Sequence, residues 1–122
     1  MDSKAVFEKV GECVFAKDWD TLATLATEDC TVTGLDGKPN PWLENWKGLY
    51  EMAGKVRWIN TYSLVTESVL IYRCYDYFES KDGSKDVMFY IDGVVTLKDG
   101  KISKIEWSMN PDQAAIFMKF LG

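Results

Sequence analysis

The chain changes its hydrophobic period once, near residue 55. Before that point apolar residues recur every three or four positions, as at Val6, Val10 and Val14, which is typical of amphipathic helices. Beyond it apolar and polar residues tend to alternate, as they do in half-buried strands. The predicted elements are helices over 2–16, 18–28 and 41–54, a short strand at 30–33, long strands at 58–67, 69–79, 86–97 and 102–109, and a short last helix at 112–121.

Two Asp-Gly pairs separate the long strands. Asp82-Gly83 and Asp99-Gly100 are typical of tight hairpin turns, so the strands they join are expected to pair antiparallel. Helices gathered in the first half and strands in the second predict an α+β fold, with the helices on one face of an antiparallel sheet. A length of 122 residues predicts a single domain over 1–122.

Composition narrows the range of partners and cofactors. The net charge of -5 disfavours nucleic acid and anionic membranes, and no apolar run is long enough to cross a bilayer. The chain has no His, and Cys13, Cys30 and Cys74 lack the paired spacing of a zinc site or a disulfide framework. We therefore expect a cytoplasmic protein with free thiols, no signal peptide, no metal and no cofactor.

Asp92 is the first candidate for chemistry, because it interrupts the apolar strand 88–95. It shares one face of that strand with Met88, Tyr90 and Val94, while Phe89 and its alternate neighbours share the other. If the Asp92 face is concave and covered by helices, its carboxyl is desolvated and can act as an acid or base. The alternative is an Asp at the rim, exposed to water or paired with a Lys or Arg.

Aromatic side chains supply the other candidates. Trp42, Trp46 and Tyr50 recur at helical spacing, and they form either part of the core or an aromatic wall over a ligand cavity, with the Tyr50 hydroxyl as its polar handle. Trp58 and Tyr90 are further candidates for the lining. Asp76, which shares a strand face with Tyr72, Cys74 and Phe78, is a second candidate pocket carboxylate if it is not exposed to solvent.

The order of elements and three local strings resemble the nuclear-transport-factor-2-like, or SnoaL-like (ketosteroid isomerase-like), superfamily. The strings are residues 17–32, residues 90–95 with 99–102, and the third helix ending at Leu49-Tyr50. The resemblance implies a cystatin-like cone, in which a curved antiparallel sheet carries three N-terminal helices on its concave face. It also implies a deep apolar cavity and a homodimer formed through the outer face of the sheet.

The resemblance also implies roles for particular residues. Asp92 matches the family's pocket carboxylic acid, which donates to an oxyanion in the steroid isomerases, and Tyr50 matches a tyrosine that supports that network. Thr33-Gly34 stands where the general base belongs, and the first helix has no Tyr for the oxyanion. These departures argue against steroid isomerase activity, and the absence of His excludes the His-dependent dehydratases.

Three functions remain open at this point, because one fold can host all of them. The first is a cofactor-independent isomerase, dehydratase or hydrolase that acts on a hydrophobic substrate, with Asp92 and Tyr50 as catalytic residues. Its ligand would contact Trp42, Trp46, Trp58, Tyr90 and Met88. The second is a carrier or sensor of a hydrophobic molecule in the same cavity, and the third is a dimeric assembly module whose cone is filled by its own aromatic side chains.

Overall fold

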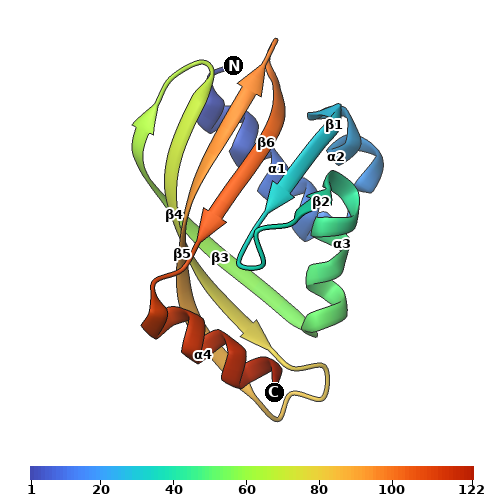
Figure 1. Cartoon of the computed structure of the whole chain (residues 1–122). Helices are drawn as coiled ribbons and strands as arrows, with labels where there is room; N and C mark the ends of the chain where they lie inside the picture. The colour runs from blue at the N-terminus through green and yellow to red at the C-terminus, as the bar shows by residue number, and fades with distance from the viewer.

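The computed structural model describes all 122 residues as four helices and six strands (Figure 1). In chain order they are α1 (Ser3–Ala16), α2 (Trp19–Thr24), β1 (Ala26–Thr33), β2 (Pro39–Pro41), α3 (Trp42–Met52), β3 (Lys55–Val65), β4 (Val69–Glu79), β5 (Asp86–Lys98), β6 (Lys101–Ser108) and α4 (Pro111–Leu121). The helices and long strands expected from the sequence are confirmed, except that the second helix, expected to reach residue 28, ends at Thr24. The strand β1 begins four residues earlier than expected, and the short β2 was not expected.

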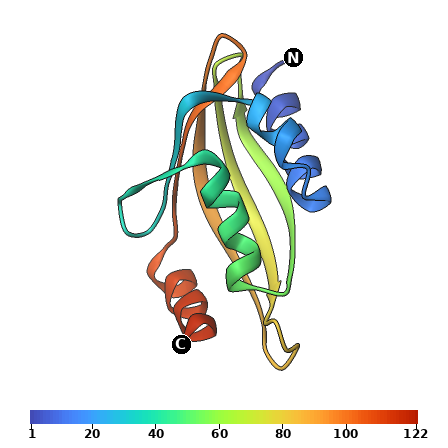
Figure 2. The same ribbon diagram turned by 90° about the vertical axis from the view of Figure 1, so that its right-hand side faces the viewer.

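The six strands form one curved, open sheet in the order β2-β1-β6-β5-β4-β3. Helices α1, α2 and α3 lie on one side of it (Figure 2), so the expected α+β architecture is confirmed. One pairing departs from a purely antiparallel sheet, because β1 runs parallel to β6. Local turn signals predict hairpins but carry no information on such a long-range pairing.

Side-chain caps fix where the helices begin. Asp2 accepts a hydrogen bond from the backbone N–H of Ala5 at the start of α1, and Asp18 accepts one from Thr21 at the start of α2. Asn110 caps α4 in the same way. These caps pair backbone N–H groups that have no partner within a helix, which explains why the polar positions in the sequence mark the boundaries well.

The cross-strand register of β3, β4 and β5 sorts their side chains into rows on two faces. Trp58, Asp76 and Phe89 stand opposite one another and form one inward row. The row beside it runs through Asn60 and Cys74 to Ile91, and the next through Tyr62 and Tyr72 to Gly93. Side chains alternate across a sheet, so the residues between these rows point to the outer face.

Two apolar clusters fill the molecule on the inward side. The larger one joins α1, α2 and α3 to β1, β4, β5 and β6, and Val14, Leu22, Leu70 and Ile102 are among its fully buried members. The smaller cluster lies at the other end of the sheet, where α4 packs its phenylalanines against Phe78 and Phe89. Between the two clusters the curved sheet, α3 and α4 leave room for a cavity.

Gly93 allows the ring of Tyr72 to lie across the neighbouring strand. A Cβ atom at Gly93 would stand 2.5 Å from the Tyr72 ring and its hydroxyl, which is too close for any side chain. Tyr72 is itself only 4% exposed and packs on Phe7 with ring centroids 4.7 Å apart, so it has no free space to move into. The glycine is therefore required by packing, not by a turn.

We expect Gly93→Ala to lower the free energy of unfolding by about 2 kcal/mol, because the added methyl group overpacks the core against Tyr72. Gly48→Ala is the matched control, since nothing lies within 4 Å of its added methyl group inside α3. Alanine favours a helix interior over glycine by roughly 1 kcal/mol, so the control should be neutral or stabilising. Urea unfolding of both variants measures the difference, and equal effects would contradict this account of Gly93.

Candidate functional site

An interior cavity of about 640 Å³ lies between the inward face of the sheet and helices α1, α3 and α4. Its walls are largely aromatic, with Trp46 on α3, Trp58 on β3, Tyr72 on β4 and Trp107 on β6. The loop after β1, the polar side of α3 and Met118 of α4 also contribute to its lining. The volume falls within the range of about 300–1,000 Å³ that is usual for small-molecule sites.

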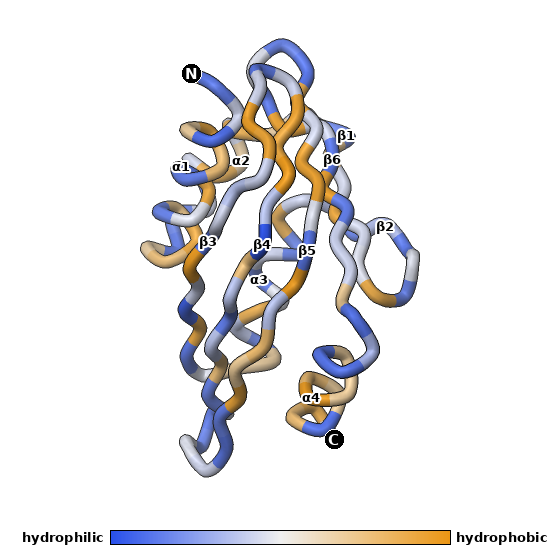
Figure 3. Tube along the Cα trace, turned by 90° about the vertical axis from the view of Figure 1, so that its left-hand side faces the viewer, coloured by the Kyte–Doolittle hydropathy of each residue, from blue (hydrophilic) through white to orange (hydrophobic).

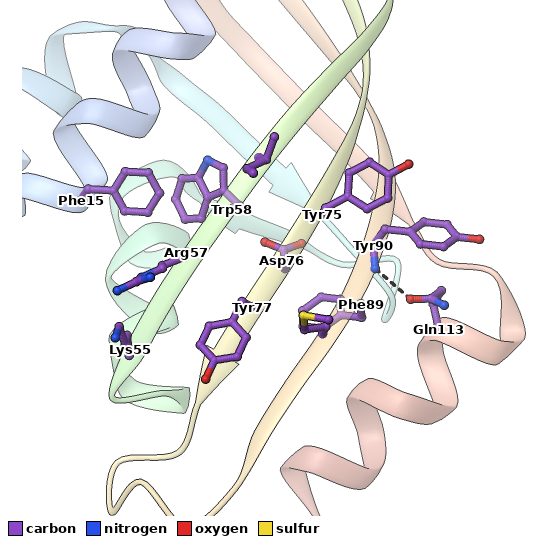
Figure 4. Close-up of a pocket in the computed structure, with 12 residues that line it drawn as sticks. Phe15, Lys55, Arg57, Trp58, Tyr75, Asp76, Tyr77, Phe89, Tyr90 and Gln113 are labelled. Carbon is purple, nitrogen blue, oxygen red and sulfur yellow. Dashed lines mark hydrogen bonds between the residues drawn. The ribbon is translucent and has the colours of Figure 1, made fainter.

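Asp76 is the only carboxyl group in the inward rows of β3, β4 and β5. It is 9% exposed and lies between Trp58 and Phe89 on the neighbouring strands. Its one hydrogen bond within the protein comes from the Cys74 thiol, with Sγ 3.4 Å from Oδ1. Figure 4 shows Asp76 and Trp58 on adjacent strands, with Phe15 of α1 beside the Trp58 ring. The second carboxyl oxygen of Asp76 has no partner in the protein.

Burial raises the pKa of Asp76 from 3.8 to about 7, and the hydrogen bond from Cys74 opposes this only in part. No positively charged side chain contributes to this shift in the pKa of Asp76. Burial also raises the pKa of the Cys74 thiol, with the nearby Asp76 charge as the second cause, so the thiol stays protonated as a donor. A carboxyl with a pKa near 7 can give up or take a proton at neutral pH, which is the requirement for a general acid or base.

Two further polar atoms at the cavity walls have no hydrogen-bond partner. They are the indole nitrogen of Trp46 and the amide oxygen of Asn60, and both are buried. Asn60 stands opposite Cys74 on the next strand, which makes it a diagonal neighbour of Asp76. An unpaired buried polar group costs about 1–3 kcal/mol, so a ligand that pairs with either atom would gain from it.

Besides Asp76, the structure brings two of the predicted site residues, Trp46 and Trp58, to the interior cavity. Their rings are 6.1 Å apart between centroids. Trp42 is buried in the core and donates to the Leu22 carbonyl at 2.9 Å. The Tyr50 hydroxyl donates to the Val14 carbonyl at 2.9 Å and thereby ties α3 to α1. Neither of these side chains lines the cavity.

The expected concave position of Asp92 is wrong, and the alternative of an exposed ion pair holds. Asp92 lies on the outer face, where it accepts two hydrogen bonds from the Arg73 guanidinium, at 2.8 and 3.1 Å. Arg73 also lies 4.2 Å from the centre of the Tyr90 ring. The alternation of the strand was assigned correctly, but both of its faces are apolar, so the sequence could not indicate which one is concave.

Met88 and Tyr90 line a second depression, the outer groove, of about 940 Å³ over β3, β4 and β5 (Figure 4). Arg57, Ile59 and Tyr75 belong to it as well, and Trp58, Asp76 and Phe89 border both this groove and the interior cavity. Ile59 is 72% exposed and Met88 73%, so the outer groove is a shallow surface and does not enclose a ligand. The interior cavity is therefore the better candidate site.

The structure has neither a cluster of metal-binding side chains nor a helix that could span a membrane. No three His, Cys, Asp or Glu side chains lie close enough together to hold a metal ion. None of the helices has the length and apolar character needed to cross a bilayer. The three cysteines are free and buried.

Comparison with known proteins identifies the fold. No protein-family model matches the chain, and no curated protein matches it. An NTF2-like protein of unknown function from Burkholderia pseudomallei superposes with a TM-score of 0.78 at 9% identity, covering 97% of this chain and 95% of the other. The chain therefore has the fold of the nuclear-transport-factor-2-like and SnoaL-like proteins, as the sequence resemblance predicted.

Two similar structures with this fold carry descriptions of activity. IdmH, a putative polyketide cyclase from Streptomyces antibioticus, has a TM-score of 0.76 at 14% identity over 98% of this chain and 97% of its own. An LEH-like epoxide hydrolase from M. tuberculosis has a TM-score of 0.67 at 17% identity over 96% of this chain and 86% of its own. At these identities the likeness establishes the fold alone.

Asp76 is the residue to which sequence reasoning gave too little weight. Its neighbours at alternate positions, Tyr72, Cys74 and Phe78, are all apolar or aromatic, and this was the signal that its face is buried. Most charged residues in proteins are exposed, and this general tendency favoured the incorrect expectation that Asp76 faces solvent. The residues on the other face of β4 include Arg73 and Glu79, and that asymmetry between the faces was the better guide.

Stability should depend on pH through Asp76. Because its pKa in the folded protein, about 7, lies above 3.8, protonated Asp76 stabilises the fold below pH 3.8, and this contribution is lost as the pH rises through 7. The difference corresponds to about 4 kcal/mol. We expect urea unfolding to show a loss of this order between pH 4 and pH 8 that Asp76→Asn lacks. Asp92→Asn should follow the wild type, and parallel curves for Asp76→Asn and wild type would contradict the burial of this carboxyl.

Proposed function

We propose that this protein binds a hydrophobic small molecule in the interior cavity and carries out acid–base chemistry on it at Asp76. The observation that carries the proposal is a carboxyl that is 9% exposed, has a pKa near 7 and faces an aromatic cavity. Cofactor-independent isomerisation, dehydration or hydrolysis requires such a group. Asp76 takes the role that the sequence suggested for Asp92.

The unpaired polar atoms of the cavity suit this chemistry. The Trp46 indole N–H is a donor for an oxygen atom of the substrate, and the Asn60 amide oxygen is an acceptor for a hydroxyl group or water. In an epoxide opening, Asp76 would give its proton to the ring oxygen as the C–O bond breaks. The attacking water would then return a proton to Asp76, so the carboxyl ends in its starting state.

The fold neighbours support this class of function without specifying the reaction. An epoxide hydrolase and a putative polyketide cyclase are both described with this fold. Both descriptions concern conversions of small organic molecules, which agrees with a cavity whose walls are largely apolar. A carrier or sensor of the same ligand is the second candidate, favoured by the presence of one interior carboxyl with no second titratable carboxyl beside it in the inward rows.

The test uses two simple hydrophobic substrates, styrene oxide for hydrolysis and 3-cyclohexen-1-one for isomerisation. We expect turnover of at least one by the wild type, and a loss of about 10²–10⁴-fold in kcat in Asp76→Asn, because a general acid or base contributes that much. Asp92→Asn is the control and should stay within about twofold. Full activity in Asp76→Asn would contradict the catalytic role, and tight binding of both compounds without turnover would favour the carrier.

We also propose that the outer face of β3, β4 and β5 forms a homodimer interface, as the resemblance implies. Figure 3 shows these strands in front with no helix over their near face. Ile59, Tyr75 and Met88 are 72%, 47% and 73% exposed, an unusual set of large apolar side chains for a monomer surface. A second copy of the chain is the occupant that would cover them.

The expected mass in sedimentation equilibrium is twice the 13.9 kDa of the chain. Replacing Ile59 and Met88 together with Lys should give a monomer, because it places charges where apolar area would be buried. Leu35→Lys is the control, since Leu35 is an exposed apolar residue of the loop after β1 and does not line the outer groove. A wild-type mass equal to that of one chain would contradict the dimer.

A further inference from the structure

The charged residues that line the interior cavity all have the same sign. They are Asp36 in the loop after β1, Glu44 and Glu51 on α3, and Asp76 on β4. None of the 14 Lys and Arg residues of the chain lines the cavity, and the chain has no His. The cavity is therefore a region of negative potential.

The four acidic residues divide into an outer and an inner set. Asp36, Glu44 and Glu51 are exposed, and seven positions along α3 place the two glutamates on the same side of the helix, two turns apart. They are the solvent-exposed part of the cavity lining. Asp76 is the inner group, and its second carboxyl oxygen is free to receive a hydrogen bond.

The aromatic walls favour a cation in the cavity, as the carboxyl groups do. The ring pairs Trp46–Trp58 and Phe78–Phe89 lie at the cavity, with centroids 6.1 and 5.1 Å apart. The face of an aromatic ring carries partial negative charge and attracts cations, and this attraction grows when water is excluded. Aromatic side chains gathered around a site are known to bind ammonium groups.

The acidic and aromatic lining of the interior cavity favours a positively charged ligand over a negatively charged one. A carboxylate or phosphate in the interior cavity would lose its hydration and find no cation to replace it, beside a carboxyl of the same sign. A protonated amine would find the Asp76 carboxylate as its counter-ion. Its remaining N–H groups could reach the amide oxygen of Asn60, a buried acceptor that has no partner in the protein.

We infer that the ligand of the interior cavity is a ring-bearing organic amine, bound as its ammonium ion with Asp76 as counter-ion and the tryptophan faces around it. This inference rests on the proposed function and narrows its ligand class. A bound ammonium ion holds Asp76 ionised, so of the two catalytic roles it favours the base. Asp76 and Trp58 also border the outer groove, but Lys55 and Arg57 in the lining of that groove make it less favourable for a cation than the interior cavity.

The first experiment compares three probes that share a naphthalene ring and differ in charge. They are 2-naphthylmethylamine, 2-naphthalenemethanol and 2-naphthoic acid, and their affinities are measured by titration calorimetry at pH 7.5. We expect the amine to bind about tenfold or more tightly than the alcohol, because a charged hydrogen bond is worth more than a neutral one, and the acid to bind more weakly than both. Equal or tighter binding of the acid would overturn the inference.

Variants locate the source of the preference. Asp76→Asn has nearly the same shape without the charge, and should remove the advantage of the amine over the alcohol. Asp92→Asn, on the outer face, is the matched control and should leave all three affinities unchanged. Replacing Glu44 and Glu51 together with Gln should weaken amine binding a few-fold, with the effect largest at low salt. An amine preference that survives in folded Asp76→Asn would overturn the assignment of the counter-ion.

Failure of the inference can be told apart from failure of the proposed function. If the alcohol binds but the amine shows no preference, the ligand class is wrong and the cavity function stands. If none of the three probes binds at millimolar concentration, the cavity is not a ligand site, and both proposals fall. The order of the three affinities in the wild-type protein tests the inference even if Asp76→Asn does not fold.

Discussion

Burial of the Asp76 carboxyl without a positive charge beside it is the constraint on which the candidate site depends. The register of β3, β4 and β5 places Asp76 in a row between Trp58 and Phe89, and the curvature of the sheet turns that row inward. Water is excluded by aromatic side chains and not by an ion pair. The carboxyl therefore keeps its proton to a pKa of about 7, and its chemistry follows from packing.

The charged side chains on the two faces of β4 differ in whether they have a partner of opposite charge. On the outer face Arg73 forms a two-point pair with Asp92, and the two side chains remain 42% and 49% exposed. Such a pair contributes little to stability, because water screens it. On the inward face a single carboxyl has only a thiol as its partner. The first arrangement satisfies both charges, whereas the second leaves one carboxyl oxygen of Asp76 without a partner in the protein.

The helices contribute the rest of the cavity by closing one side of the cone. Tyr50 and Trp42 hold α3 to α1 and α2 through hydrogen bonds to the carbonyls of Val14 and Leu22. These bonds fix the face of α3 that carries Trp46 toward Trp58. Tyr50 and Trp42 thus act on the site through the position of α3, since neither lines the cavity itself.

The sequence by itself determined the elements, their order and the fold class, because periodicity, caps and Asp-Gly turns act over a few residues. It also identified the alternate faces of β4 and β5 correctly. Only the tertiary structure decided which face is concave, and it buried Asp76 while leaving Asp92 exposed on the outer face. The parallel pairing of β1 with β6 was likewise decided there. Both outcomes depend on contacts between residues far apart in the chain, and local sequence patterns do not predict such contacts.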